Sequence, residues 1–227
     1  GRQEELLLRA GRMNVPFGIR SVEHTMFPRM TTRTDTNTGQ QHGVSLDYHR
    51  GPVRASLMGI AGNYQLSPDR FRSRGYAGLF EIALQPTLAV GASSMVTHAA
   101  ADLLLSGPAW RQAHGGFVRY SPVRLAVVNA EWDFLHTSQS FPGTTSFGGV
   151  GMVNVDLEPI QGLHLGPTFE VLARDFGDEP SYGLWASAWW FFFSHADVRF
   201  DAIGQRLAGP GGAAHVVTGI LQLHVYL

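Results

Sequence analysis

Four prolines recur at nearly equal intervals and separate segments that alternate in polarity. The spacings are 34, 36 and 37 residues between Pro52, Pro86, Pro122 and Pro159. On both sides of each proline, apolar residues occupy every second position, which is the periodicity of a β-strand with one apolar face. The connections between the proline turns are longer and richer in polar residues and glycine; they span 65–74, 99–113 and 137–148. The pattern therefore predicts antiparallel hairpins joined alternately by tight turns and long loops.

About twelve strands follow from this alternation. In 163–175, for example, Leu165, Phe169 and Val171 alternate with polar residues. The predicted strands are 9–20, 42–50, 53–64, 76–85, 87–97, 114–120, 123–136, 149–158, 163–175, 182–194, 197–206 and 215–227. Short turns at one end and long loops at the other are typical of barrels that cross a membrane. We predict an all-β fold, a transmembrane antiparallel up-and-down β-barrel, as one domain over residues 1–227 with an N-terminal extension at 1–8 and a long outer loop at 21–41.

The composition excludes several other classes. Apolar residues make up 44% of the chain, but no stretch reaches the 18 apolar residues of a membrane-spanning helix. The chain has no cysteine, so disulfides, thiol catalysis and covalent c-type haem attachment are excluded within it. A net charge of −1 provides no broad basic surface for nucleic acid. No secretion signal is visible at Gly1, so we expect either that a signal was removed or that strands precede this residue.

A soluble antiparallel sandwich is the main alternative fold. It does not suit the run of tryptophan and phenylalanine at 189–193, because an exposed strand of that kind would aggregate. The tyrosines also favour a membrane, since they lie only near predicted strand ends: Tyr64, Tyr76 and Tyr182 at the outer end, and Tyr48, Tyr120 and Tyr226 at the inner end. Membrane barrels carry two such aromatic girdles.

The last predicted strand supplies a resemblance to a known family. Val217, Leu221 and Val225 share one face, and the alternation continues to the final residue. It resembles the C-terminal signal of outer-membrane β-barrel proteins, although Leu227 stands where that family usually has phenylalanine or tryptophan. The chain is thus similar to porin-like proteins. The resemblance implies a location in the outer membrane of a Gram-negative-type bacterium.

Charged residues on the polar faces are predicted to line a pore. They are Asp47, Arg54, Glu81, Arg119, Glu131, Asp133, Asp156, Glu170, Arg174, Arg199 and Asp201. With Glu158, the inward set has eight acids and four arginines, which predicts a mild preference for cations if the lumen is open. In the alternative interpretation, these charges pair across strands and hold the barrel in shape.

Residues 11–29 combine charge with proline and glycine where the first strand passes into the longest loop. We predict that this segment contributes a constriction or outer loop through Arg20, Glu23, His24 and Arg29. In the alternative interpretation, Arg20 pairs with Glu23 while Pro16 and Gly18 shape the strand end. The segment also resembles one found in barrels that accompany multihaem cytochromes, and this implies a protein partner.

The leading functional hypothesis is therefore an outer-membrane porin-like channel for small solutes. The alternative is a scaffold or sheath barrel that holds a partner protein, such as a multihaem cytochrome, in the outer membrane. An embedded hydrolase is a third hypothesis, but no nucleophile elbow is present. We predict no catalytic residues, metal site or cofactor, and no enzyme activity. The expected partners are the lipid bilayer and either another protein or further copies of this chain, without nucleic acid.

Overall fold

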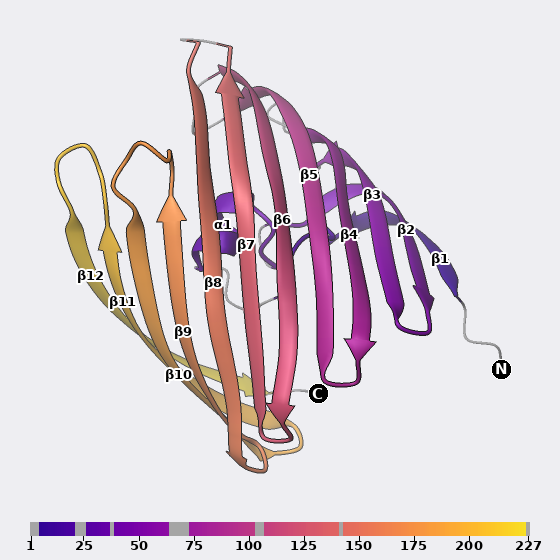
Figure 1. Ribbon diagram of the computed structural model, residues 1–227, viewed down its shortest axis with the longest axis vertical. Coiled ribbons are helices and arrows are strands. Elements are labelled where there is room, and N and C mark those ends of the chain that lie inside the picture. Colours follow the sequence, from indigo (N-terminus) through magenta and orange to yellow (C-terminus); the bar gives the residue numbers. More distant parts are fainter. Residues whose placement is uncertain are drawn as a thin grey trace.

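The computed structural model describes residues 5–20, 26–36, 39–63, 73–102, 107–140 and 143–225. They form one antiparallel sheet of twelve strands, each paired with its neighbours in sequence (Figure 1). The strands are β1 (Leu6–Met13), β2 (Gln41–Arg50), β3 (Val53–Gly62), β4 (Ser73–Gln85), β5 (Leu88–Asp102), β6 (Gly107–Val123), β7 (Ala126–Gln139), β8 (Thr145–Ile160), β9 (Leu163–Ala173), β10 (Ser181–Phe193), β11 (Ala196–Leu207) and β12 (Ala214–Val225). A single short helix, α1 (Phe27–Thr32), occurs in the described part of the chain.

Each predicted strand overlaps an observed one, and the differences concern where strands end. The loop predicted at 99–113 is mostly strand, since β5 and β6 continue their pairing through Ala99 and Ala109. The loop predicted at 137–148 is shortened in the same way by pairing between Ser138 and Thr145. β1 begins at Leu6, inside the predicted N-terminal extension. No described helix is long and apolar enough to cross a membrane.

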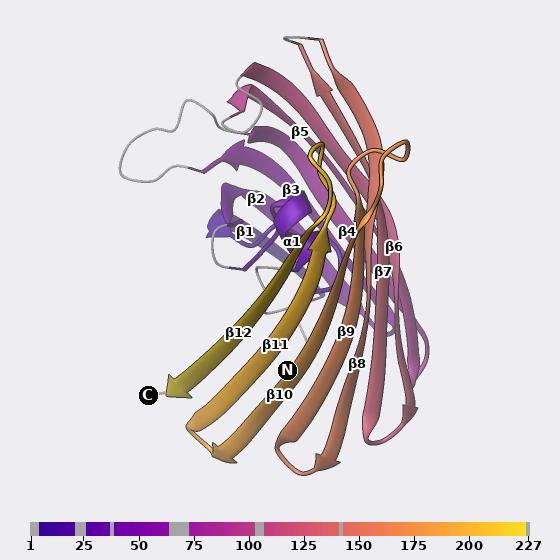
Figure 2. The same ribbon diagram turned by 90° about the vertical axis from the view of Figure 1, so that its left-hand side faces the viewer.

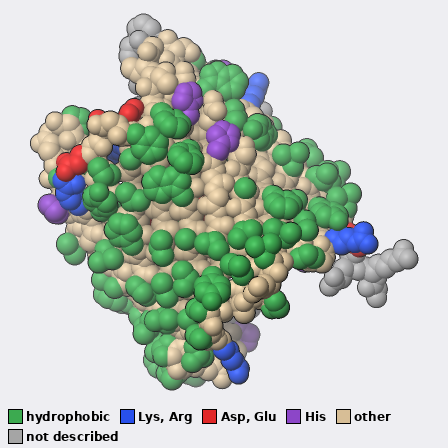
Figure 3. Space-filling view, in the orientation of Figure 1, with side chains coloured by type: hydrophobic (Ala, Val, Ile, Leu, Met, Phe, Trp, Pro, Cys, Tyr) green, Lys and Arg blue, Asp and Glu red, His purple; other side chains and the backbone are tan. Residues whose placement is uncertain are grey.

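The register separates two faces of opposite character. On β9, Leu165 and Phe169 point outward and are 38% and 46% exposed, whereas Thr168 and Glu170 are buried on the inner side. The same alternation occurs in β3, β5 and β11 and leaves large apolar side chains on the outside, whereas the edge strands β1 and β12 are mostly exposed on both faces. Figure 3 shows this apolar surface across the strands, with charged side chains gathered mainly near its margins. Such an inversion of the soluble pattern suits a sheet whose outer face meets lipid.

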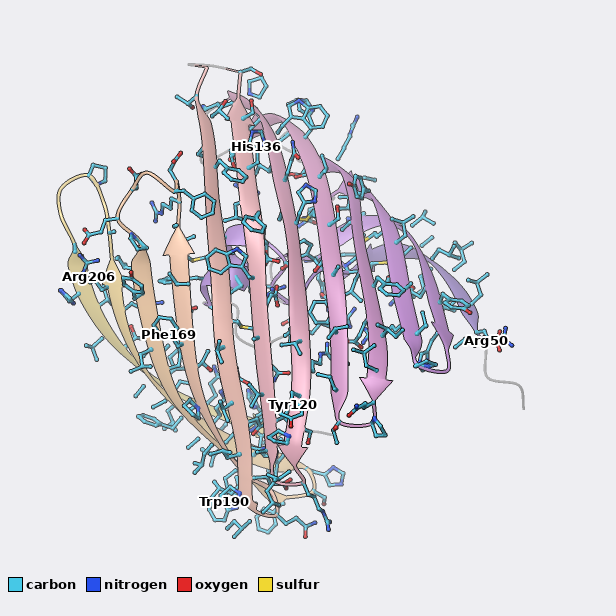
Figure 4. All side chains as sticks on the ribbon, in the orientation of Figure 1. Arg50, Tyr120, His136, Phe169, Trp190 and Arg206 are labelled. Carbon is cyan, nitrogen blue, oxygen red and sulfur yellow. The ribbon has the colours of Figure 1, made fainter. Side chains whose placement is uncertain are left out.

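Aromatic side chains mark the two ends of the strands. The exposed Tyr76 and Tyr182 lie near the loop ends of β4 and β10, and the exposed Tyr48 and Tyr120 lie near the turn ends of β2 and β6. Figure 4 shows Tyr120 and Trp190 near the turn end, opposite His136. Tyr64 and Tyr226 lie outside the described residues.

The sheet curls around a central space that contains α1 (Figure 2). β1 and β12 are its two edges, and no register joins them within the described residues. A bilayer requires such edges to be paired, because it offers no water to their backbone groups. The helix packs on the inner face of β8 and β9. The interior is therefore occupied, in part, by the chain's own connection between β1 and β2.

Candidate functional site

The connection between β1 and β2 enters the space that the sheet encloses. We call its described part, residues 14–20 and 26–36, the inward segment. It supplies Val15, Phe17, Ile19, Met26 and Phe27 to three buried apolar clusters. The strands of the wall contribute the other members of each cluster. Val15 and Phe17 cluster with Met58, Ile60, Ala77, Met95 and Ala113; Ile19 and Met26 with Leu79, Phe117, Met152, Trp185 and Ile203; and Phe27 with Val150 and Leu172. Because these partners come from β3 to β11, the segment is part of the core.

Local chemistry explains why the first strand stops early. The prediction of one strand over 9–20 is wrong, since β1 ends at Met13. Pro16 has no N–H to give to a sheet ladder. Gly18 has φ of +59°, a left-handed conformation that turns the backbone away from an extended path. The chain then leaves the sheet and turns into the interior.

Hydrogen bonds to the wall hold the inward segment in place. Three of its backbone N–H groups donate to wall side chains: Gly18 to Ser93 Oγ at 3.0 Å, Ile19 to Glu131 Oε2 at 2.7 Å, and Phe27 to Glu170 Oε2 at 2.6 Å. From the wall, Arg111 donates to the carbonyl oxygen of Thr31 at 2.8 Å. The buried backbone of the segment therefore has partners on β5, β6, β7 and β9.

Arg29 is the charged centre of this arrangement. Its guanidinium forms an ion pair with Glu131 and lies 4.0 Å from Asp133, and all three side chains are at most 2% exposed. Arg29 also donates to the carbonyl oxygen of Phe17 and to Thr34 Oγ1, each at 3.0 Å. Removing one partner from a buried ion pair is far more costly than removing an exposed one. The pair therefore ties the inward segment to the middle of β7.

A cavity of about 230 Å³ with a wall of mixed polar and apolar residues lies beside the inward segment, toward the turn end of β7 to β11. On its wall, Arg199 donates to Asp201 at 2.9 Å and lies over the Trp189 ring, 5.5 Å from its centroid. His164 lies 3.0 Å from Asp156. The lining residues are Ile19, Arg20, Met26, Asn129, Met152, Asn154, Asp156, His164, Gly166, Thr168, Ser187, Trp189 and Arg199.

Arg20 contributes a guanidinium to this cavity from the inward segment. It makes no ion pair with any residue that the structure describes. Burial lowers the pKa of Arg20, and the nearby charges of Arg54 and Arg9 lower it further, whereas Asp47 raises it.

The structure brings most of the predicted charged residues to the inner face, where they form pairs. Asp47 pairs with Arg9 at 2.7 Å. Glu81 lies 3.9 Å from Arg54 and 3.3 Å from Arg119. Glu170 accepts N–H groups from Phe27, Trp185 and Gln205. These contacts agree with the alternative interpretation, in which the charges hold the sheet in shape, and their role in lining a pore stays a prediction.

Other predicted residues fall outside the enclosed space or the described chain. Arg174 is exposed just beyond the end of β9, so the structure does not bring it to the cavity. Glu23 and His24 lie outside the described residues. Arg20 and Arg29 are brought together with the wall as parts of the inward segment, rather than as parts of an outer loop.

Sequence reasoning missed several inward arginines. Arg9, Arg33 and Arg111 contact interior groups and were not predicted to do so. Arg29 was predicted as part of a constriction or outer loop and was not counted among the inward charges, so the count of eight acids against four arginines was incomplete. Arg111 lay in the loop predicted at 99–113. Its separation of eight positions from Arg119 would have placed it on the inner face, had that segment been recognised as strand.

Comparison with known proteins identifies the fold. No protein-family model matches the chain, and no curated protein matches it significantly. The crystal structure of the outer membrane channel DcaP of Acinetobacter baumannii aligns with a TM-score of 0.68 and 12% identity over 96% of this chain and 71% of that one. Outer-membrane expressed OmpT of Vibrio cholerae aligns with a TM-score of 0.77 and 11% identity over 99% of this chain and 78% of that one.

Both similar structures are outer-membrane proteins, as their descriptions state, which agrees with the predicted location. At these identities the likeness concerns the fold, and it does not transfer an activity. The prediction that the protein is not an enzyme therefore stays a prediction. The architecture is that of an outer-membrane β-barrel, an antiparallel up-and-down arrangement of twelve described strands.

Proposed function

We propose that the protein is an outer-membrane channel for small solutes, narrowed inside the lumen by the inward segment. The observation that carries this proposal is the ion pair of Arg29 with Glu131, which fixes a connecting segment within the sheet's curve. Channels select solutes at constrictions lined by charged and polar groups. DcaP, one of the similar structures named above, is described as an outer membrane channel, which supports the same class of function.

The inner wall has the chemistry that passage of a polar solute requires. The wall of the cavity next to the inward segment includes the polar side chains of Asn129, Asn154 and Arg199. Wall and segment charges surround the space, whereas the outer face is apolar. A solute moving along the interior would thus meet these polar groups beside the three apolar clusters.

A sheath that holds a partner protein fits the geometry less well. Such a function needs room for another polypeptide within the barrel. The inward segment and its three apolar clusters fill part of that space with the chain's own residues. A channel is therefore the function that the arrangement supports best.

Single-channel conductance in planar lipid bilayers tests the proposal. We expect the purified protein to give small conductance steps, and we expect Arg29→Met to give larger ones. The substitution leaves Glu131 and Asp133 buried without the guanidinium, at a cost of about 3–5 kcal/mol, and should release the inward segment. The matched control is Arg206→Met, which removes an ion pair with Glu179 at the exposed loop end.

The control should keep the conductance of the unchanged protein. Folding of each variant is checked by circular dichroism and by resistance to unfolding in detergent before insertion. If the folded protein and the folded Arg29→Met variant both give no steps, the channel proposal is wrong. If the two substitutions change conductance equally, the inward segment is not the constriction.

A further inference from the structure

We propose that the cavity beside the inward segment binds small organic anions, each with a carboxylate on a compact apolar or aromatic body. This inference rests on the proposed channel function and names its class of solute. It combines three observations: the charge balance around the cavity, the mixed chemistry of its wall, and its size. They indicate, in turn, the charge of the ligand, its apolar part and its size.

The charged side chains around the cavity favour an anionic ligand. Arg20 lines the cavity without an ion pair among the residues that the structure describes. Two carboxylates of this region already pair with arginines: Asp47 with Arg9, and Asp201 with Arg199. Asp156, on the cavity wall, lies 3.0 Å from His164. A guanidinium presents parallel N–H groups that match a carboxylate in a bidentate geometry. A carboxylate on the ligand would therefore give Arg20 a partner that it does not have among the described residues.

The other residues of the cavity wall favour a ligand whose carboxylate is attached to an apolar group. Ile19 and Met26 of the inward segment and Met152 of β8 provide apolar surface to the cavity. The Trp189 indole N–H is already donated to Asp197 at 2.6 Å, and Arg199 lies over the ring, so Trp189 offers the ligand no free donor. A phosphate or sulfate ion would leave this surface uncovered. A neutral sugar would leave Arg20 without a charged partner.

The size of the cavity restricts the ligand to a small molecule. Its volume of about 230 Å³ corresponds to roughly seven or eight water molecules at about 30 Å³ each. Pockets for drug-sized ligands are larger, about 300–1,000 Å³. Asn129 donates to Asn154 at 3.3 Å, and Asn154 donates to Thr168 at 2.7 Å, so the amide side of the wall is held in one arrangement. A single-ring carboxylate suits this space.

Isothermal titration calorimetry on the detergent-solubilised protein tests the site, with benzoate as the probe. Three other compounds serve as comparisons. Benzyl alcohol is aromatic but neutral, inorganic phosphate is an anion without an apolar part, and glucose is a neutral sugar. We expect benzoate to bind most tightly, and we expect Arg20→Gln to weaken it about tenfold or more, the loss expected for a hydrogen bond to a charged group. Arg20→Lys, which keeps the charge, should recover part of this affinity.

Arg50→Gln is the matched control, because Arg50 lies at the turn end, pairs with Glu5 and is absent from the cavity wall. It should leave benzoate binding unchanged. The proposal is overturned if Arg20→Gln binds benzoate as tightly as the unchanged protein, or if phosphate, glucose or benzyl alcohol binds as tightly as benzoate. Benzyl alcohol binding alone would indicate an apolar pocket without the anion site.

Conductance separates this proposal from the proposed function. If the protein gives conductance steps but does not bind benzoate, the channel proposal stands and the anion-site proposal is overturned. Benzoate binding that depends on Arg20, when neither the folded protein nor its Arg29→Met variant conducts, would support the site and overturn the channel. When both hold, benzoate should reduce the conductance of the unchanged protein and have a much smaller effect on Arg20→Gln.

Discussion

At the scale of single residues, the interior depends on a few close contacts. Glu131 accepts the N–H of Ile19 and pairs with Arg29, so one carboxylate holds two parts of the inward segment. Gly18 lies between these groups with φ of +59°. A Cβ at this position would overlap Glu131 and would lie 2.7 Å from Arg29 Nη1. Glycine is therefore favoured at residue 18 for two reasons: its left-handed backbone conformation, and the close approach of Glu131 and Arg29.

Gly18→Ala should destabilise the protein more than Gly51→Ala, although both glycines have similar left-handed φ angles. Gly51 has φ of +55° in the turn after β2, and a Cβ there would meet nothing within 4 Å. Its substitution should cost only the left-handed strain, about 1–2 kcal/mol. Gly18→Ala should cost that amount plus the displacement of Arg29 and Glu131. Urea unfolding of the detergent-solubilised variants measures both costs, and equal losses would contradict the crowding at Gly18.

At the scale of elements, α1 depends on the wall for its stability. The helix has six residues, and isolated helices of this length are unstable in water. Met26, at its N-cap position, makes no capping hydrogen bond with its side chain. Glu170 of β9 takes that role from outside the helix by accepting the Phe27 N–H, and it also accepts from Trp185 and Gln205. One carboxylate thus joins α1 to three neighbouring strands.

Glu170→Leu should therefore loosen α1 more than Glu170→Gln does. Leucine leaves three N–H donors without their acceptor, at about 1–3 kcal/mol for each donor that stays buried and unpaired. Glutamine keeps an acceptor oxygen and should cost less. Hydrogen exchange of the backbone amides in 26–36 provides the measurement, and we expect faster exchange in the leucine variant. Equal protection in both variants would show that Glu170 does not hold the helix.

At the scale of the whole molecule, the arrangement places hydrocarbon outside and polar groups inside. Val153 of β8 is 45% exposed on the outer face, and the neighbouring Asn154 lines the cavity beside the inward segment. Leu221 of β12 is 74% exposed on the same outer face. Water would not stabilise so much exposed apolar surface on paired strands, whereas lipid does. The outer face is therefore expected to contact the acyl chains of the bilayer.

Arginine at adjacent positions of β8 tests this arrangement. Val153→Arg places a charge in lipid near the middle of the strand and should cost about 2–4 kcal/mol. Asn154→Arg places the same side chain in the polar interior and should cost less, because successive residues of a strand face opposite sides. Unfolding from lipid vesicles by urea gives both free energies. A larger loss for Asn154→Arg would reverse the assignment of the two faces.

Polarity-sensitive spin labels provide a second measurement at this scale. The chain contains no cysteine, so single cysteines introduced at Val153, Leu165 and Leu221 can be labelled without background. Labels at these outward positions should report hydrocarbon in lipid vesicles. Labels that report water at all three positions would contradict a transmembrane sheet.

The alternation of residues along the chain was enough to predict the strands and the faces they present. Val153 and Val155 differ in polarity from Asn154 and Asp156, and such contrast between neighbours is a local signal. Asp47, Glu81, Glu131 and Glu170 were assigned to the inner face by this signal, and the structure places them there in contact with other interior groups. The ends of β5 to β8 were missed because the alternation weakens where strands extend toward the loops.

Only the tertiary structure decided what fills the interior. Arg29 and Glu131 are separated by 102 positions, and Phe27 and Glu170 by 143, so no local pattern records that they meet. The same holds for Arg20, whose place beside the cavity depends on the path of the inward segment through the enclosed space. Strand periodicity is set by the backbone of each segment alone. Contacts between distant segments depend on how the whole sheet curves, and that curvature is a property of all the strands together.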